Sequence, residues 1–268
     1  MADPKLNTMK KLDGFAFDTP LVGFSSATDE LYPYYKNHID PNFYRLPEEW
    51  LKGYYKHDFD PKNVSVVSWV LPQTEDTRKK ARECDDAPTL EWERVRVYGE
   101  ECNRDMAEAL QNWLREQGIE AIAPIVSPEF SWGDSERFFL ISNWSERHTA
   151  LISGLGTFGL CDGLITKAGK AVRYGSVILN APLTPTKREY TEYNEYCQAK
   201  NGCRACINRC PADAITPEGG HNKALCQKFQ QETTAKILKE RYDYDELAVC
   251  GLCQTGVPCE AGIPEKLN

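Results

Sequence analysis

Eight of the eleven cysteines in this chain lie near its C-terminal end, at positions 197, 203, 206, 210, 226, 250, 253 and 259. The segment Cys203-Arg-Ala-Cys206-Ile-Asn-Arg-Cys210-Pro211 has the spacing of the last three cysteines in the bacterial ferredoxin run C-x2-C-x2-C-x3-C-P. In that run the cysteine before proline ligates the other cluster. Eight thiolates are enough for two [4Fe–4S] clusters, so the cysteines predict low-potential electron transfer.

Two other uses of cysteine are possible at these spacings. Zinc ribbons built on Cys203/Cys206 and Cys250/Cys253 would leave four of the eight cysteines and the Cys-Pro pair unexplained. Disulfides are the least favoured, because no apolar signal segment precedes the chain and nothing indicates an oxidising compartment. Two [4Fe–4S] clusters are therefore the preferred interpretation.

The cysteines divide into two predicted ligand sets. Lys200 stands where the ferredoxin run has its first cysteine, so Cys197 must reach in from three residues earlier. Cys259 follows Cys253 after five residues, where a ferredoxin has two or three. Cluster 1 is assigned to Cys197, Cys203, Cys206 and Cys259, and cluster 2 to Cys210, Cys226, Cys250 and Cys253.

Composition and length describe a soluble globular chain with one large and one small domain. Its 268 residues are 41% hydrophobic, enough for a packed core, and contain no apolar run long enough to span a membrane. We expect a cytoplasmic protein. The net charge of −8 disfavours a general affinity for phosphate backbones.

Hydrophobic periodicity predicts an α/β or α+β fold. Strands are expected at 64–71, 119–125, 164–166 and 172–179, helices at 90–117 and 146–153, and a glycine-rich turn at 154–160. The segment 181–186, with two prolines, is the expected linker. It divides the chain into domains at 1–186 and 187–268.

Several motifs occur in order along the chain. They are Ser145-Glu-Arg-His-Thr-Ala-Leu-Ile-Ser-Gly-Leu-Gly-Thr-Phe-Gly159, Leu164-Ile-Thr166, Gly175-Ser-Val177 and the two-cluster module. Together, over about 60–262, they resemble the epoxyqueuosine reductase and reductive dehalogenase superfamily. The resemblance implies a nitroreductase-like corrinoid-binding domain, followed by a small ferredoxin-like domain. It also implies cobalamin beside the two [4Fe–4S] clusters, which would pass electrons to its cobalt.

The resemblance implies a set of corrinoid-contacting residues. A corrin is broad, flat and edged with amides, so close backbone approach at glycine suits its surface. For Arg147 the alternative is a role in bracing its helix, and for His148 ordinary packing is an equal alternative. The set comprises Arg147, His148, Gly154, Leu155, Gly156, Thr157, Phe158, Gly159, Arg173, Gly175 and Ser176.

The proton donor is the main departure from epoxyqueuosine reductase. In that subfamily an aspartate precedes the arginine matching Arg147 by about seven residues, whereas this chain reads Leu140-Ile-Ser-Asn-Trp144. Asp134, Glu136, Ser142 and Tyr174 are the candidate donors, although each residue type more often has an ordinary structural role.

The predicted function is a cobalamin-dependent iron–sulfur reductase. The alternative is a non-catalytic electron carrier, or a reductant of another protein's corrinoid. We expect an external donor such as ferredoxin or flavodoxin, and a small-molecule substrate or a partner protein's cofactor. tRNA is disfavoured because the chain is acidic. The remaining cysteines, Cys84, Cys102 and Cys161, are expected to be buried, with Cys161 able to approach the corrinoid.

Overall fold

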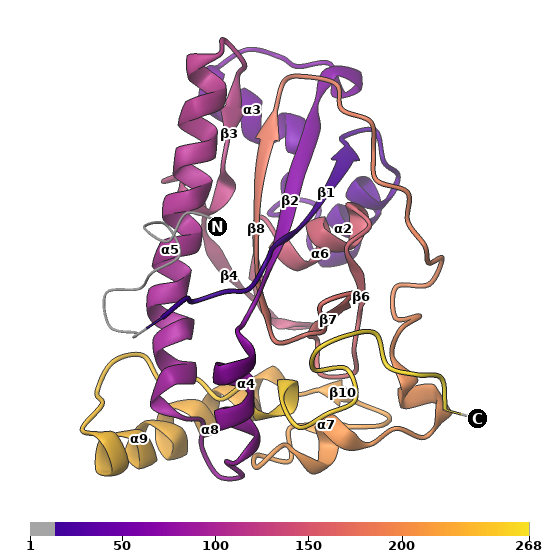
Figure 1. Cartoon of the computed structure of the whole chain (residues 1–268). Coiled ribbons are helices and arrows are strands. Elements are labelled where there is room, and N and C mark those ends of the chain that lie inside the picture. The colour runs from indigo at the N-terminus through magenta and orange to yellow at the C-terminus, as the bar shows by residue number, and fades with distance from the viewer. Residues whose placement is uncertain (1–13, 268) are drawn as a thin grey trace.

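The computed structural model describes residues 14–267. Its centre is an antiparallel sheet with the strand order β1-β2-β8-β3. The bounds are Leu21–Ser26 for β1, Ser65–Pro72 for β2, Val172–Leu179 for β8 and Ala121–Ile122 for β3. Figure 1 shows the cysteine-rich part of the chain, coloured orange to yellow, at one end of this sheet, next to α4 (Glu75–Arg82).

Helices cover both faces of the sheet (Figure 1). The long helix α5 (Leu90–Glu116) lies on one face, and α2 (Leu31–Ile39), α3 (Pro47–Tyr55) and α6 (Glu146–Ile152) lie on the other. Side chains alternate between the faces of a strand, so Val66 and Val70 pack toward α6 while Trp69 and Leu71 pack toward α5. This alternation explains why 65–72 forms a strand buried on both faces.

The remaining elements are short. Two hairpins pair β4 (Trp132–Ser135) with β5 (Phe139–Ser142) and β6 (Gly156–Phe158) with β7 (Leu164–Thr166). The cysteine-rich part contains α7 (Ala205–Asn208), β9 (Ile215–Thr216), β10 (Gly220–His221), α8 (Lys223–Phe229) and α9 (Ala235–Tyr242). A π-helical turn, Gln230–Thr234, joins α8 to α9.

Local signals explain where the main helices begin and end. The hydroxyl of Thr89 accepts a hydrogen bond from Trp92 N at the start of α5, and that of Ser145 accepts one from His148 N at the start of α6. Gly118 follows α5 with a φ of +77°. These caps match the start and end predicted for both helices.

The strands predicted at 64–71, 164–166 and 172–179 are confirmed. The strand predicted at 119–125 is too long, because Pro124 begins a 3-10 turn and leaves only Ala121–Ile122 in the sheet. The predicted glycine-rich turn contains a strand, β6. Because the central sheet is antiparallel, α+β is the applicable fold class.

The segment expected to be a linker is attached to the sheet domain. Thr186 N donates to Phe24 O at 2.9 Å, and Phe24 N donates to Thr186 Oγ1 at 2.9 Å. The domain boundary at 186 stays a prediction. None of the helices within residues 14–267 combines the length and apolarity needed to cross a bilayer.

Candidate iron–sulfur and cofactor site

The four cysteines predicted to hold cluster 1 lie around one pocket. Cys197, Cys203, Cys206 and Cys259 all line it, together with Lys170. Three segments supply them: the turn before α7, α7 itself and the C-terminal loop. Cysteines far apart in the sequence are thus brought to one place, as the predicted grouping requires.

The predicted cluster 2 cysteines are also neighbours, and Cys253 lies beside both Cys250 and Cys161. Burial, with the thiolates of Cys226 and Cys210 beside it, raises the pKa of Cys250 to about 12. Gln230 Nε2 donates to Cys226 Sγ at 3.0 Å, and Ala214 N donates to Cys210 Sγ at 3.4 Å. N–H groups directed at cysteine sulfur are typical of iron–sulfur sites, where they stabilise the thiolate charge.

The donor chemistry fits [4Fe–4S] clusters. A cubane takes one thiolate at each of four corners, and each predicted set supplies four cysteines. No two cysteines in the described part of the chain form a disulfide. In that same part, no three His, Cys, Asp or Glu side chains are close enough to hold a single metal ion. Ligation by these eight residues stays a prediction.

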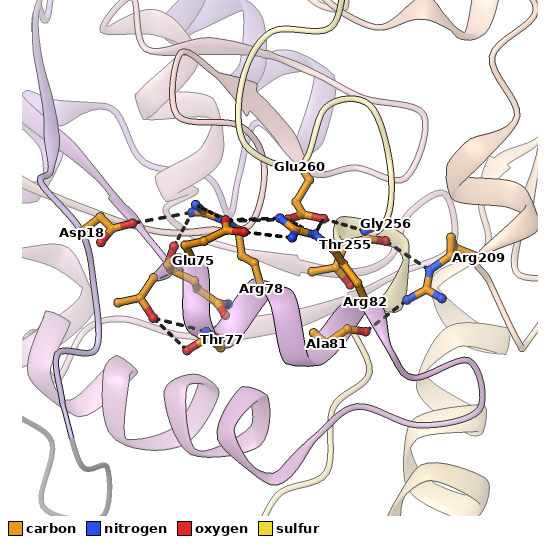
Figure 2. A network of polar contacts seen from close by, with 12 residues as sticks. Asp18, Glu75, Thr77, Arg78, Ala81, Arg82, Arg209, Thr255, Gly256 and Glu260 are labelled. Carbon is orange, nitrogen blue, oxygen red and sulfur yellow. Dashed lines mark hydrogen bonds and ion pairs between the residues drawn. The ribbon is translucent and has the colours of Figure 1, made fainter.

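A polar network fixes the loop that carries Cys259 (Figure 2). Glu260, which is buried, accepts from Arg82 Nε of α4 at 2.9 Å and from Gly256 N at 2.6 Å. Arg78 lies 3.7 Å from the same carboxylate. Arg209, just before Cys210, donates to Ala81 O at the end of α4 and to Thr255 O, both at 3.2 Å. Helix α4 therefore holds the loop of Cys259 and the end of α7 together.

A turn of the sheet domain contacts the same loop from the other side. Lys170 N donates to Cys259 O at 3.0 Å and to Glu260 O at 3.1 Å. Gly169 has a φ of +81°, and a Cβ atom there would lie 1.9 Å from Glu260 O. Only glycine permits this approach, so the 169–170 turn helps to position Cys259.

The three cysteines outside the predicted clusters differ in burial. Cys161 is buried as predicted, whereas the prediction is wrong for Cys84 and Cys102, which are half-buried. Hydrogen bonds with Cys206 and Cys253 lower the pKa of Cys161. Cys161 therefore lies between one predicted ligand of each cluster. Its neighbourhood was not predicted, because it depends on contacts across more than forty residues of sequence.

The side chains predicted to contact a corrinoid have partners within the chain. Arg147 donates to Asp162 O, Arg173 Nε donates to Glu100 Oε2 at 3.1 Å, and Trp144 Nε1 donates to Ser176 Oγ at 3.0 Å. The centroid of the His148 ring lies 4.4 Å from the centroid of the Tyr35 ring and 4.9 Å from that of the Phe158 ring. Burial and the charge of Arg147 lower the pKa of His148 to about 3, so it is neutral.

The predicted glycine cradle contacts the protein itself. A Cβ at Gly156 would lie 2.2 Å from Ile165 O, and one at Gly175 would lie 2.5 Å from the indole of Trp69. Polar groups of the neighbouring residues form hydrogen bonds within the chain. Phe158 N donates to Tyr193 O, Gly159 N donates to Gly163 O, and Tyr196 N donates to Thr157 Oγ1. Leu155 packs in the core, and Gly154 follows the C-terminal end of α6 with a φ of +78°. The chain itself thus fills the Cβ direction of Gly156 and Gly175. Contact of this segment with a corrinoid stays a prediction.

The four candidate proton donors are in three different settings. Asp134 and Glu136 are exposed on the β4–β5 hairpin. Ser142 Oγ donates to Trp144 O at 2.6 Å. Tyr174 OH accepts from Leu164 N at 3.2 Å, and burial raises its pKa. The structure does not bring the four together.

Glu146 is an acid that the sequence analysis did not select. Both of its carboxyl oxygens are buried, and the side chains of Ser176 and Trp144 lie beside them. Burial raises its pKa to about 8, so the carboxyl is protonated at neutral pH. Its position after a helix-capping serine indicated only a helix start, because burial of a carboxyl has no signature in sequence.

Glu93 gives a pH-dependent prediction. Glu93 is fully buried on α5, and its carboxylate accepts a hydrogen bond from Val249 N at 3.1 Å. Burial raises the pKa of Glu93 from 4.5 to about 8, and the hydrogen bond partly opposes this rise. Between pH 4.5 and about 8, Glu93 is protonated in the folded protein and ionised in the unfolded chain. The unfolding free energy therefore falls as the pH rises through this range. Glu93→Gln keeps an acceptor and removes the charge, and should raise the unfolding free energy near pH 8 by roughly 1–3 kcal/mol. Urea unfolding at several pH values measures this; an unchanged pH slope in the variant would contradict it.

Two of the three comparisons with known proteins gave nothing: neither a family model nor a curated protein matches the chain. Among solved structures, it is similar to the catabolic reductive dehalogenase NpRdhA, with 16% identity and a TM-score of 0.56 over 91% of this chain and 30% of that one. A reductive dehalogenase studied for B12-dependent dehalogenation gives 15% identity and a TM-score of 0.54, over 88% of this chain and 29% of that one. An epoxyqueuosine reductase solved with a modified tRNA-Tyr stem loop gives 19% identity and a TM-score of 0.53, over 94% of this chain and 64% of that one.

These similarities confirm the fold that the resemblance predicts. The chain has the fold shared by reductive dehalogenases and epoxyqueuosine reductases. It spans about a third of the dehalogenases and less than two thirds of the epoxyqueuosine reductase.

Proposed function

We propose that this chain is an iron–sulfur reductase in which two [4Fe–4S] clusters carry electrons one at a time to an acceptor. The observation that carries the proposal is the gathering of the cysteines at one end of the sheet. Four line one pocket, Cys210 and Cys226 lie beside Cys250, and Cys253 lies beside both Cys250 and Cys161. Cys161 lies next to Cys206 of one group and Cys253 of the other, so the two groups adjoin. Adjoining clusters allow an electron to pass from one to the other.

A corrinoid is the proposed acceptor, supported by the fold. One of the similar structures is a reductive dehalogenase studied for B12-dependent dehalogenation. Arg147 and Arg173 have partners within the chain, so a corrinoid at the residues predicted from sequence would share these side chains with Asp162 and Glu100. The second candidate function is reduction of a corrinoid held by another protein.

A small molecule or a partner's cofactor is the proposed substrate, with a ferredoxin or flavodoxin as electron donor. The acidic chain disfavours a polyanion such as tRNA. If reduction requires a proton, Glu146 is a better source than Asp134 or Glu136, because its buried carboxyl holds a proton at neutral pH. Ser142 and Tyr174 remain candidates.

Metal analysis and EPR test the proposal. Anaerobically reconstituted protein should contain about eight iron and eight sulfide per chain. About four iron atoms per chain, or zinc in place of iron, would contradict the proposal of two clusters. Adding cobalamin and recording the Co(II) EPR signal after gel filtration decides between the acceptors: retained cobalt supports a corrinoid in this chain, and cobalt lost from cluster-loaded protein supports an external acceptor. Robust turnover of epoxyqueuosine-tRNA would overturn the proposed substrate class.

A further inference from the structure

Lys170 is a buried cation at the predicted cluster 1 site. Its side chain is 2% exposed and lines the same pocket as Cys197, Cys203, Cys206 and Cys259. Its Nζ donates to Cys161 Sγ at 3.3 Å. Within residues 14–267 no carboxylate forms an ion pair with this ammonium.

An ammonium without a carboxylate is costly to bury unless other negative charge lies nearby. Sulfur is the nearby source of charge here. A [4Fe–4S] core with four thiolates is anionic, and Lys170 lines the pocket formed by the four cysteines that would hold such a core. The negative charge that balances the ammonium therefore belongs to the cysteine site.

The surroundings of the cluster 2 cysteines are different. His221, which neighbours Cys226, has Asp162 Oδ2 at 3.2 Å from its Nδ1, so a carboxylate balances any positive charge on this ring. Lys170 has no such partner. Cys253 of the predicted cluster 2 also lies near Lys170. All four cluster 1 cysteines line the same pocket as Lys170, so its field acts more strongly on cluster 1.

We propose that Lys170 is a positioning residue that sets the reduction potential of cluster 1 above that of cluster 2. The inference rests on the proposed two-cluster function. A [4Fe–4S] core with four thiolates is anionic and takes one electron without gaining a proton, so reduction adds one negative charge. A fixed cation in a poorly solvated site stabilises the reduced form more than the oxidised form. The electron supplied by the external donor then resides preferentially on cluster 1.

The test compares Lys170→Met with Lys170→Arg and with Lys167→Met. Lys167 is an exposed lysine three residues away, paired with Glu189, and serves as the matched control. EPR-monitored redox titration of the reconstituted proteins measures the potential of each cluster. In Lys170→Met the ratio of reduced to oxidised cluster 1 at a fixed potential should fall at least tenfold. For a one-electron couple this corresponds to a decrease of about 59 mV in the reduction potential of cluster 1. Lys170→Arg and Lys167→Met should stay near the parent.

An unchanged cluster 1 potential in Lys170→Met with full iron overturns the proposal. If Lys170→Met does not hold cluster 1, Lys170→Arg decides between charge and packing. A Lys170→Arg protein that keeps its iron and its cluster 1 potential shows that the charge is required. A Lys170→Arg protein that loses as much iron as Lys170→Met shows a packing role and overturns the inference. Parent protein with fewer than two clusters contradicts the proposed function itself, which the iron assay reveals before any variant is compared.

Discussion

Cys203→Ala should remove cluster 1 and leave cluster 2, and Cys253→Ala should do the reverse. Each variant should lose about four of the eight irons, because a cubane lacking one of its thiolates is poorly retained. The two should also lose different EPR signals in the reduced state, because the predicted ligand sets share no cysteine. Iron and sulfide analysis with EPR of the reconstituted proteins makes the measurement.

Cys84→Ala is the matched control, since this half-buried cysteine belongs to neither predicted set. It should retain about eight irons. Loss of the same signal in Cys203→Ala and Cys253→Ala would contradict the division into two sets. Loss of iron in Cys161→Ala, equal to that in Cys203→Ala, would show that Cys161 is a ligand and that one of the irregular members, Cys197 or Cys259, is not.

Gly169→Ala should have the largest effect among substitutions outside the cysteines. The new Cβ would lie 1.9 Å from Glu260 O, a distance no structure tolerates, so the loop that carries Cys259 must move away. The positive φ of +81° adds strain for any L side chain. We expect the unfolding free energy to fall by about 3 kcal/mol or more, the range of severe steric and backbone changes, and cluster 1 to be lost selectively.

Gly118→Ala isolates the backbone part of this effect. Gly118 has a similar φ of +77°, and its added Cβ would meet nothing within 4 Å. This control should cost only about 1–2 kcal/mol and keep both clusters. Anaerobic urea unfolding and iron analysis compare the two variants. Equal destabilisation, with full iron in both, would show that the 169–170 turn does not position the Cys259 loop.

The sequence by itself determined the elements whose signals are local. The apolar run at 64–71 and the amphipathic pattern at 90–117 predict β2 and α5, because an apolar run and helical periodicity are properties of neighbouring residues. The Cys203–Cys210 spacing likewise predicts a cluster loop. The order of motifs from Ser145 to Val177 was enough to indicate the superfamily fold, despite low overall identity to the similar structures.

Only the tertiary structure decided what surrounds those elements. Gly156 and Gly175 predict a cofactor cradle from sequence, and only folding shows that Ile165 O and the indole of Trp69 approach these two glycines closely. Lys170 and Cys161 had no distinguishing pattern, yet folding places both beside the cluster cysteines. Contacts between segments far apart in the chain depend on how the 255–260 loop packs on α4 and the 169–170 turn, and local spacing contains no information about that packing.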